Sequence, residues 1–247
     1  MSPRVCIAVL LVVIGVTVGA DRSVSAQVRP FEAADIYRQQ AVGDVQLSPD
    51  GERVAYSVRK SDRPGRPYSE VWVMEIASGA VSKLGGEGGF ASGPRWSPNG
   101  LEIAYFGVVE GQVGLVVARA DGSAEKFLTP ITGTNHPLPS AGERIAWAPD
   151  GDRIAFVSAT GEAEDAAAGD PMVITRYLYK PTASEGMTRF NDNRRVHIFI
   201  FDRITNRVNQ LTSGIYYEHS IDWSPQGDEI VFVSNREPDP DRVFNYD

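Results

Sequence analysis

Residues 94–105 read Pro-Arg-Trp-Ser-Pro-Asn-Gly-Leu-Glu-Ile-Ala-Tyr, and this stretch decides the fold because its pattern occurs four times in the chain. Each copy has a small residue, a proline, a polar residue and a glycine at its centre, followed by an apolar run. The other three copies begin at Val45, Ile145 and Ile221. Self-similarity of this kind is the sequence signature of a repeat architecture.

The centre of each copy has the chemistry of a tight turn. Proline fixes φ near −65° at the first central position, and glycine accepts the positive φ that closes the turn. The residues after the glycine are β-branched or aromatic, as in residues 230–233, which favours strands buried on both faces. The pattern predicts hairpins near residues 45–58, 94–107, 145–158 and 221–234.

Two more strands are expected after each of the first three hairpins, joined by glycine turns such as Ser78-Gly79. Four antiparallel strands make one blade of a β-propeller. We therefore predict an all-β fold, a partial β-propeller of four-stranded antiparallel blades with WD-like or TolB-like repeats. The additional strands are expected at residues 71–76, 80–84, 114–119, 125–129, 197–202 and 207–212.

The spacing of the repeats predicts an insertion. The turn prolines stand at positions 49, 98, 149 and 225, which gives spacings of 49, 51 and 76 residues. The longer third spacing places an insertion at residues 159–193, and repeat proteins tolerate insertions on one face, often the binding face. Ahead of the first blade, residues 31–38 are expected to form a packed helix.

The N-terminus has the pattern of a secretory signal peptide over residues 1–26. The apolar run from Cys6 to Val18 is too short for a membrane-spanning helix, and the small residue Ala26 suits a signal peptidase. Cleavage after Ala20 and an uncleaved N-terminal anchor are the alternatives. The expected location is secreted or periplasmic, with a propeller domain at residues 27–247 that lacks cysteine and has no disulfide.

Charge and residue types narrow the classes of function. The formal net charge of −8 argues against nucleic acid or an anionic membrane as a partner. No Gly-x-Ser-x-Gly motif occurs, because the nearest stretch, residues 89–93, has its serine one place late. His136, His197 and His219 are expected to be surface or hydrogen-bonded histidines. The sequence therefore predicts no catalytic residue.

Metal and cofactor sites are not expected either. The only cysteine, Cys6, lies in the predicted signal peptide, and the three dispersed histidines alone match no zinc-binding spacing. The acidic segments 162–165 and 237–241 lack the glycine and the spacing of a calcium loop, so they are interpreted as solvated loops. Trp96, Trp147 and Trp223 recur at one repeat position and are expected in the core.

The repeated turn resembles the repeats of TolB-type periplasmic propellers and of the prolyl oligopeptidase family. The later part of the chain resembles the propeller of acylaminoacyl peptidases and related dipeptidyl peptidases more specifically. The resemblance runs from about Phe31 to Asp247. The segments that carry it are residues 173–180, 191–199, 210–214 and 232–241.

This resemblance implies an N-terminal propeller that restricts the access of peptides to a C-terminal α/β-hydrolase domain, which performs acyl transfer with serine, aspartate and histidine. The present sequence does not contain that domain, so the chain alone is expected to be inactive and to meet peptide substrates only together with it. Arg176, Tyr177 and Arg194 are candidate substrate contacts, although packing and ion pairs between blades would explain them too. The alternative function is a TolB-like periplasmic module for protein–protein interaction.

Overall fold

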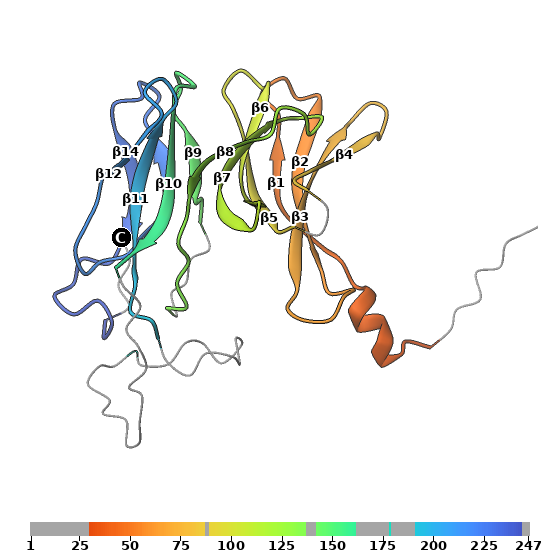
Figure 1. The fold of residues 1–247 in the computed structure, drawn as a ribbon, viewed down its shortest axis with the longest axis horizontal. Helices are drawn as coiled ribbons and strands as arrows, with labels where there is room; N and C mark the ends of the chain where they lie inside the picture. The colour runs from red at the N-terminus through yellow and green to blue at the C-terminus, as the bar shows by residue number, and fades with distance from the viewer. Residues whose placement is uncertain (1–29, 87–88, 137–141, 162–177, 179–190, 244–247) are drawn as a thin grey trace, which may run out of the picture.

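A computed structural model of the chain describes residues 30–86, 89–136, 142–161, 178 and 191–243. In this part of the chain, three four-stranded antiparallel sheets are followed by a two-stranded one. Figure 1 shows the sheets side by side, as the blades of a propeller stand. The predicted all-β fold of four-stranded antiparallel blades is thus confirmed.

Each full blade is a simple meander in which every strand pairs with the next one along the chain. The first blade consists of β1 (Ala41–Leu47), β2 (Arg53–Lys60), β3 (Tyr68–Glu75) and β4 (Val81–Leu84). The second consists of β5 (Ala91–Trp96), β6 (Glu102–Val109), β7 (Gln112–Arg119) and β8 (Lys126–Pro130). The third consists of β9 (Ile145–Trp147), β10 (Arg153–Thr160), β11 (Arg195–Asp202) and β12 (Arg207–Gln210), and β13 (Glu218–Trp223) with β14 (Ile230–Ser234) forms the fourth hairpin.

The four repeated turns have one hydrogen-bonded geometry. In the first, the Gly51 amide donates to the Ser48 carbonyl at 2.9 Å, and the Ser48 amide donates to the Arg53 carbonyl at 2.8 Å. The turn glycine has a positive φ in every copy, between 69° and 75°. The proline and glycine therefore act locally as the sequence predicts. We call this end of the sheets the turn end and the opposite end the pocket end.

Neighbouring blades pack face to face around three apolar clusters. Ala55, Ala104 and Ala155 occupy the same repeat position, and all three are fully buried. Each of them belongs to a different one of the three clusters. A small residue here lets adjacent sheets approach closely. The innermost strands β1, β5, β9 and β13 also contact one another in order, as expected around a propeller axis.

The recurring tryptophans hold adjacent blades together with an indole hydrogen bond. Trp96 Nε1 donates to the Gln46 carbonyl at 3.1 Å. Trp147 Nε1 donates to the Arg95 carbonyl at 3.0 Å, and Trp223 Nε1 donates to the carbonyl of Ala146 at 3.1 Å. Each acceptor lies in the innermost strand of the preceding blade, so one donor is repeated at all three interfaces.

An arginine covers each of these tryptophans. Arg53 lies 4.9 Å from the Trp96 ring centroid and donates to the Gly100 carbonyl at 2.9 Å. Arg153 lies 4.8 Å from the Trp223 ring and donates to the Gly227 carbonyl at 2.8 Å. In both cases the arginine belongs to the preceding blade and binds the turn of the following one.

The interface between the second and third blades reverses this arrangement. The second blade carries Glu102 where its neighbours carry arginine. Here Nη2 of Arg203, in the third blade, donates to both carboxylate oxygens of Glu102, at 2.9 and 3.1 Å, and the guanidinium lies 5.1 Å from the Trp147 ring centroid. It also donates to the Gly151 carbonyl at 3.0 Å. An arginine therefore covers the tryptophan at this interface too, but it belongs to the following blade instead of the preceding one.

Two expectations at the ends of elements need correction. The insertion was expected to begin at residue 159, but Ala159 and Thr160 belong to β10 and pair with Val196 and Arg195. Residues 162–177 and 179–190 of that insertion lie outside the described residues, as does the signal peptide at 1–26. The predicted N-terminal helix is the 3-10 helix η1 (Ala33–Arg38), which has no buried residue. Its residues Ile36 and Tyr37 line one pocket with the loop between β2 and β3, so it contacts the first blade at this loop.

Candidate functional site

A cavity of about 240 Å³ opens at the pocket end, between the third blade and the fourth hairpin. It lies at the far end of β9, β10 and β13 from the repeated turns, beside the segment that follows β8. Its lining combines polar and apolar surface in about equal parts, whereas the contacts between the blades are apolar. The polar side chains that line it are Thr132, Thr134, His136, Arg144, Ser158, Glu218 and His219.

A fully buried carboxylate, that of Glu218, forms one wall of the cavity. Glu218 Oε2 lies 2.8 Å from His197 Nδ1 and accepts a hydrogen bond from Thr212 Oγ1 at 2.9 Å. Its other oxygen pairs with Arg236 at 2.8 Å. Burying a charge is costly unless it is paired and hydrogen-bonded, and these three contacts meet that condition. The contacts also join β11, β13 and the segment after β14.

A second polar cluster lies behind the cavity. Arg195 makes a bidentate contact with Asp241 at 2.8 and 3.0 Å, and His136 Nε2 lies 3.5 Å from the same carboxylate. The His136 and Tyr217 ring centroids lie 4.2 Å apart with the ring planes tilted by 34°, and the Arg195 guanidinium lies 4.7 Å from the Tyr217 ring centroid. These contacts attach the segment containing Asp241 to the third blade.

Burial and hydrogen bonding shift the pKa values of His136 and Asp241 in this second cluster. Desolvation lowers the pKa of His136, despite the opposing attraction of Asp241. Burial would raise the pKa of Asp241, but hydrogen bonds from His136 and Arg195 hold it well below its usual range. The cluster is therefore built for an ionised aspartate beside a neutral histidine at neutral pH.

Arg144 stands out among the cavity residues because it carries a positive charge without a matching carboxylate. Its guanidinium lies 4.9 Å from the Phe106 ring centroid. Arg144 makes no ion pair with any residue that the structure describes. The nearby Arg95, in contrast, pairs with Asp44 at 2.7 Å and with Glu143. Arg144 also lines the adjoining cavity around Asp44. The Arg144 guanidinium therefore borders both cavities between the innermost strands.

The predicted contact residues are only partly placed. Arg176 and Tyr177 lie outside the described residues. Arg194 is half-buried beside the cavity-lining segment, where its carbonyl accepts a hydrogen bond from Thr134 Oγ1 at 3.5 Å and its amide donates to Asp192 at 3.1 Å. The side chain of Arg194 does not line the cavity.

The three histidines turn out to lie at this end of the molecule. His197 and His136 are buried, and His219 hydrogen-bonds Ser220 at 2.9 Å. They are hydrogen-bonded or ion-paired, as one of the two sequence interpretations expected. The interpretation of the acidic segment 237–241 as a wholly solvated loop is wrong, because Asp241 is buried against Arg195.

Sequence reasoning missed Glu218 and Arg144, although a signal exists for Glu218. Glu218 stands seven residues before its turn proline, where the first two blades carry the apolar residues Val42 and Ala91. Arg144 stands five residues before its proline, where the second blade has Gly93. The first blade has Asp44 at the position of Arg144, so only Glu218 is a charged residue at an otherwise apolar or small repeat position.

The polar groups of the cavity are suited to holding a small anionic or carbonyl group. An arginine, hydroxyl groups and neutral imidazoles can hold a carboxylate or a peptide carbonyl. Among the residues that the structure describes, no three histidine, cysteine, aspartate or glutamate side chains are grouped so as to hold a metal ion. Over the same residues, no helix is both long and apolar enough to cross a membrane.

Comparison with known proteins gives relatives of two kinds, while no protein-family model matches the chain. A Bacillus subtilis (strain 168) protein, "Uncharacterized peptidase YuxL", is 28% identical over 213 residues, which cover 82% of this chain and 31% of that protein. Among solved structures, the Pyrococcus horikoshii acylaminoacyl peptidase matches with a TM-score of 0.54 and 15% identity, over 81% of this chain and 28% of that one.

TolB from Acinetobacter baumannii matches with a TM-score of 0.50 and 16% identity, over 84% of this chain and 40% of TolB. At these identities the structural matches show the propeller fold alone. The chain spans less than a third of the length of the Bacillus subtilis peptidase and of the acylaminoacyl peptidase. By sequence and by fold, the chain is therefore similar to the N-terminal propeller region of prolyl oligopeptidase-family peptidases.

Proposed function

We propose that this chain is the propeller portion of a secreted serine peptidase of the prolyl oligopeptidase family. In this role it restricts the access of peptides and forms one wall of their binding site, while a separate α/β-hydrolase part performs acyl transfer. The observation that carries the proposal is the similarity to a peptidase over 82% of the chain. The lack of a Gly-x-Ser-x-Gly nucleophile motif in the sequence supports a non-catalytic role.

The cavity at the pocket end supplies a place for the peptide. Its volume of about 240 Å³ suits part of a short peptide, and Arg144 can form charge-assisted hydrogen bonds with a carboxylate or a carbonyl. The predicted insertion leaves the third blade at the same end, because Thr160 and Arg195 flank it there. A binding face at this end agrees with the usual position of insertions in repeat proteins.

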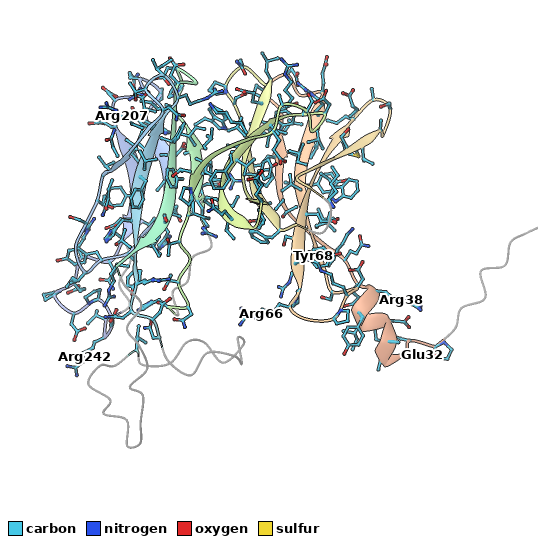
Figure 2. All side chains as sticks on the ribbon, viewed as in Figure 1. Glu32, Arg38, Arg66, Tyr68, Arg207 and Arg242 are labelled. Atoms are coloured by element: carbon cyan, nitrogen blue, oxygen red, sulfur yellow. The ribbon has the colours of Figure 1, made fainter. Side chains whose placement is uncertain are left out.

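Two measurements on the chain test the proposal. Chromogenic acyl-amino-acid and dipeptide substrates should not be hydrolysed, whereas a short N-acetylated peptide with a free carboxylate should bind weakly in calorimetry. Arg144→Ala should weaken that binding by about tenfold, the value of one charge-assisted hydrogen bond. Arg207→Ala is the matched control, since Figure 2 shows Arg207 at the turn end. Hydrolysis traced to a serine of this chain would contradict the proposal.

A TolB-like interaction module is the second candidate, and the TolB match over 84% of the chain favours it. In that case the exported chain would form a stable complex with another protein, and short peptides would not bind. Equal affinity of the unmodified chain and the Arg144→Ala variant for such a protein, together with no peptide binding, would favour this candidate over the first.

A further inference from the structure

A second cavity lies at the pocket end of the first blade, between the helix η1 and the loop that joins β2 to β3 (Figure 1). We call it the η1 cavity. Ile36 and Tyr37 line it from the helix, and residues 61–65 with Pro67 line it from the loop. Its volume is about 670 Å³, against about 240 Å³ for the cavity around Arg144, and the two share no lining residue. A volume of this size is typical of a ligand-binding cleft.

Apolar side chains gather at the helix side of the η1 cavity. Ile36 and Tyr37 are 54% and 65% exposed, and Phe31, which stands two residues before the helix, is 65% exposed. Exposed apolar groups that are clustered, instead of scattered singly, mark an interaction surface. The helix side therefore offers apolar contacts to a partner.

The loop side of the cavity is held in place before any partner binds. The Tyr68 hydroxyl donates to Asp62 at 2.8 Å, and the Arg63 guanidinium lies 3.5 Å from the Tyr68 ring centroid. Pro64 and Pro67 fix the backbone φ at two further positions of the loop. A wall with restricted conformations loses less entropy on binding, which favours association.

The charge around the η1 cavity is opposite to that of the whole chain. Residues 59–66 hold four basic residues and one acidic residue, a formal net charge of +3, whereas the chain carries −8. Arg66 is exposed and makes no ion pair with any residue that the structure describes. The Arg38 side chain is 72% exposed and reaches only its helix neighbour Asp35, at 3.5 Å. Such an exposed pair is weak, so Arg38 is free to bind a carboxylate of a partner.

We propose that the η1 cavity is a docking site for an acidic, extended segment of another protein. An apolar side chain of that segment enters the cavity beside Ile36 and Tyr37. Carboxylates on either side of it pair with Arg38 on the helix and Arg66 on the loop, which Figure 2 shows on opposite sides of these two segments. Charge complementarity selects acidic segments against basic ones. The site is independent of the peptide binding proposed for Arg144.

An anionic membrane suits this surface less well, although it would also attract arginines and exposed aromatic rings. The net charge of −8 repels such a membrane from the rest of the chain. A bilayer surface also does not fill a concave site, whereas one side chain of an extended segment does. We therefore assign the cavity to a polypeptide.

Fluorescence anisotropy with a labelled peptide tests the proposal. The peptide carries phenylalanine between two acidic residues on each side and is blocked at both ends, so it offers no terminal carboxylate to Arg144. It should bind the chain saturably, and more weakly as salt is added. Arg38→Glu and Arg66→Glu should each lower the affinity about tenfold. Arg207→Glu, at the turn end, and Arg144→Ala should leave it unchanged, which separates this site from the cavity around Arg144.

The apolar part of the contact is tested separately. Tyr37→Ala should lower the affinity several-fold, and circular dichroism should show an unchanged fold because Tyr37 is exposed. Serine in place of the phenylalanine of the peptide should have the same effect. A peptide with lysines in place of its acidic residues should not bind.

Four results would overturn the proposal. The first is no binding of the acidic peptide, or equal binding of the lysine peptide. The second is an equal loss of affinity in Arg207→Glu and Arg66→Glu. The third is binding of phosphatidylglycerol vesicles in place of the peptide, which would assign the surface to a membrane. The fourth is self-association of the chain that Arg66→Glu abolishes, which would assign it to a second copy.

Discussion

The two ends of the sheets are built on different principles. At the turn end, the same indole hydrogen bond and the same arginine contact recur at all three interfaces. At the pocket end, Glu218 and Asp241 are held by ion pairs that are not repeated at the equivalent positions of the other blades, as far as the described residues go. Repeated contacts fix the spacing of blades, whereas unique ones shape a single cavity and are free to serve binding.

This difference separates stability from specificity within one fold. The turn end can tolerate a change in which blade supplies the arginine, as the pair Glu102 and Arg203 shows. At the pocket end the charges are buried, and removing one partner of a buried ion pair is strongly destabilising. We therefore expect larger losses from single substitutions at the pocket end, and compensation by a second substitution at the turn end.

The largest effect is expected from His197→Ala. His197 and Glu218 are 2% and 0% exposed in their side chains, so removing the imidazole leaves a buried carboxylate without one of its three partners. The free energy of unfolding should fall by about 3 kcal/mol in urea denaturation. His219→Ala, on the partly exposed neighbour of Glu218, is the control and should cost clearly less. Equal losses for both variants would argue against the buried pair.

An intermediate effect is expected from Trp147→Phe. The change keeps an aromatic ring under Arg203 but removes the N–H that donates to the Arg95 carbonyl. Leaving that carbonyl unpaired should cost about 1–2 kcal/mol of unfolding free energy. Trp223→Phe removes the equivalent bond to Ala146 and should cost a similar amount. Unequal losses would show that the two interfaces are less alike than their geometry indicates.

A smaller effect with a specific rescue is expected at the reversed interface. Arg203→Ala should cost about 1 kcal/mol, because it removes the cation over Trp147 and leaves Glu102 unpaired. Adding Glu102→Arg places an arginine where Arg53 and Arg153 stand in their own blades. Thermal or urea unfolding of the double variant should then recover at least half of the loss. A double variant that is less stable than Arg203→Ala would contradict the interchange.

The smallest effect is a dependence of stability on pH. Burial lowers the pKa of His136, so the unfolded chain binds that proton more readily than the folded one. This contribution is complete above the usual histidine pKa and is lost as the pH falls through about 6.5 towards the lower folded value. The pKa of Asp241 is held low, so its contribution persists in that range. Between pH 7.5 and 5.5, stability should fall less in His136→Asn than in the unmodified chain.

Much of the fold could be predicted because its determinants are local. The prolines and glycines of the four turns act within a few residues, and the strands after them follow from β-branched and aromatic residues. The repeat pattern ends this strand at residue 158, whereas β10 continues to Thr160, because its last pairs, Ala159 with Val196 and Thr160 with Arg195, join segments separated by the insertion. Pairing over such a distance leaves little trace in the local sequence.

The candidate site could not be predicted to the same degree. Glu218 is stabilised by Arg236, Thr212 and His197, and none of these residues belongs to the repeated pattern. The interblade indole bonds were also missed, because core burial alone accounts for a recurring tryptophan. The position of Arg194 beside the insertion makes it a candidate substrate contact, yet its described contacts are made by its backbone.

The central claim is that peptides bind at the pocket end and that the turn end is structural. Hydrogen–deuterium exchange of the chain with and without a short N-acetylated peptide carrying a free carboxylate tests it most directly. The account predicts slower exchange at residues 132–136, 157–159 and 218–219, and unchanged exchange at the four repeated turns. Protection confined to the turns, or no protection anywhere at a peptide concentration that saturates binding, would contradict it.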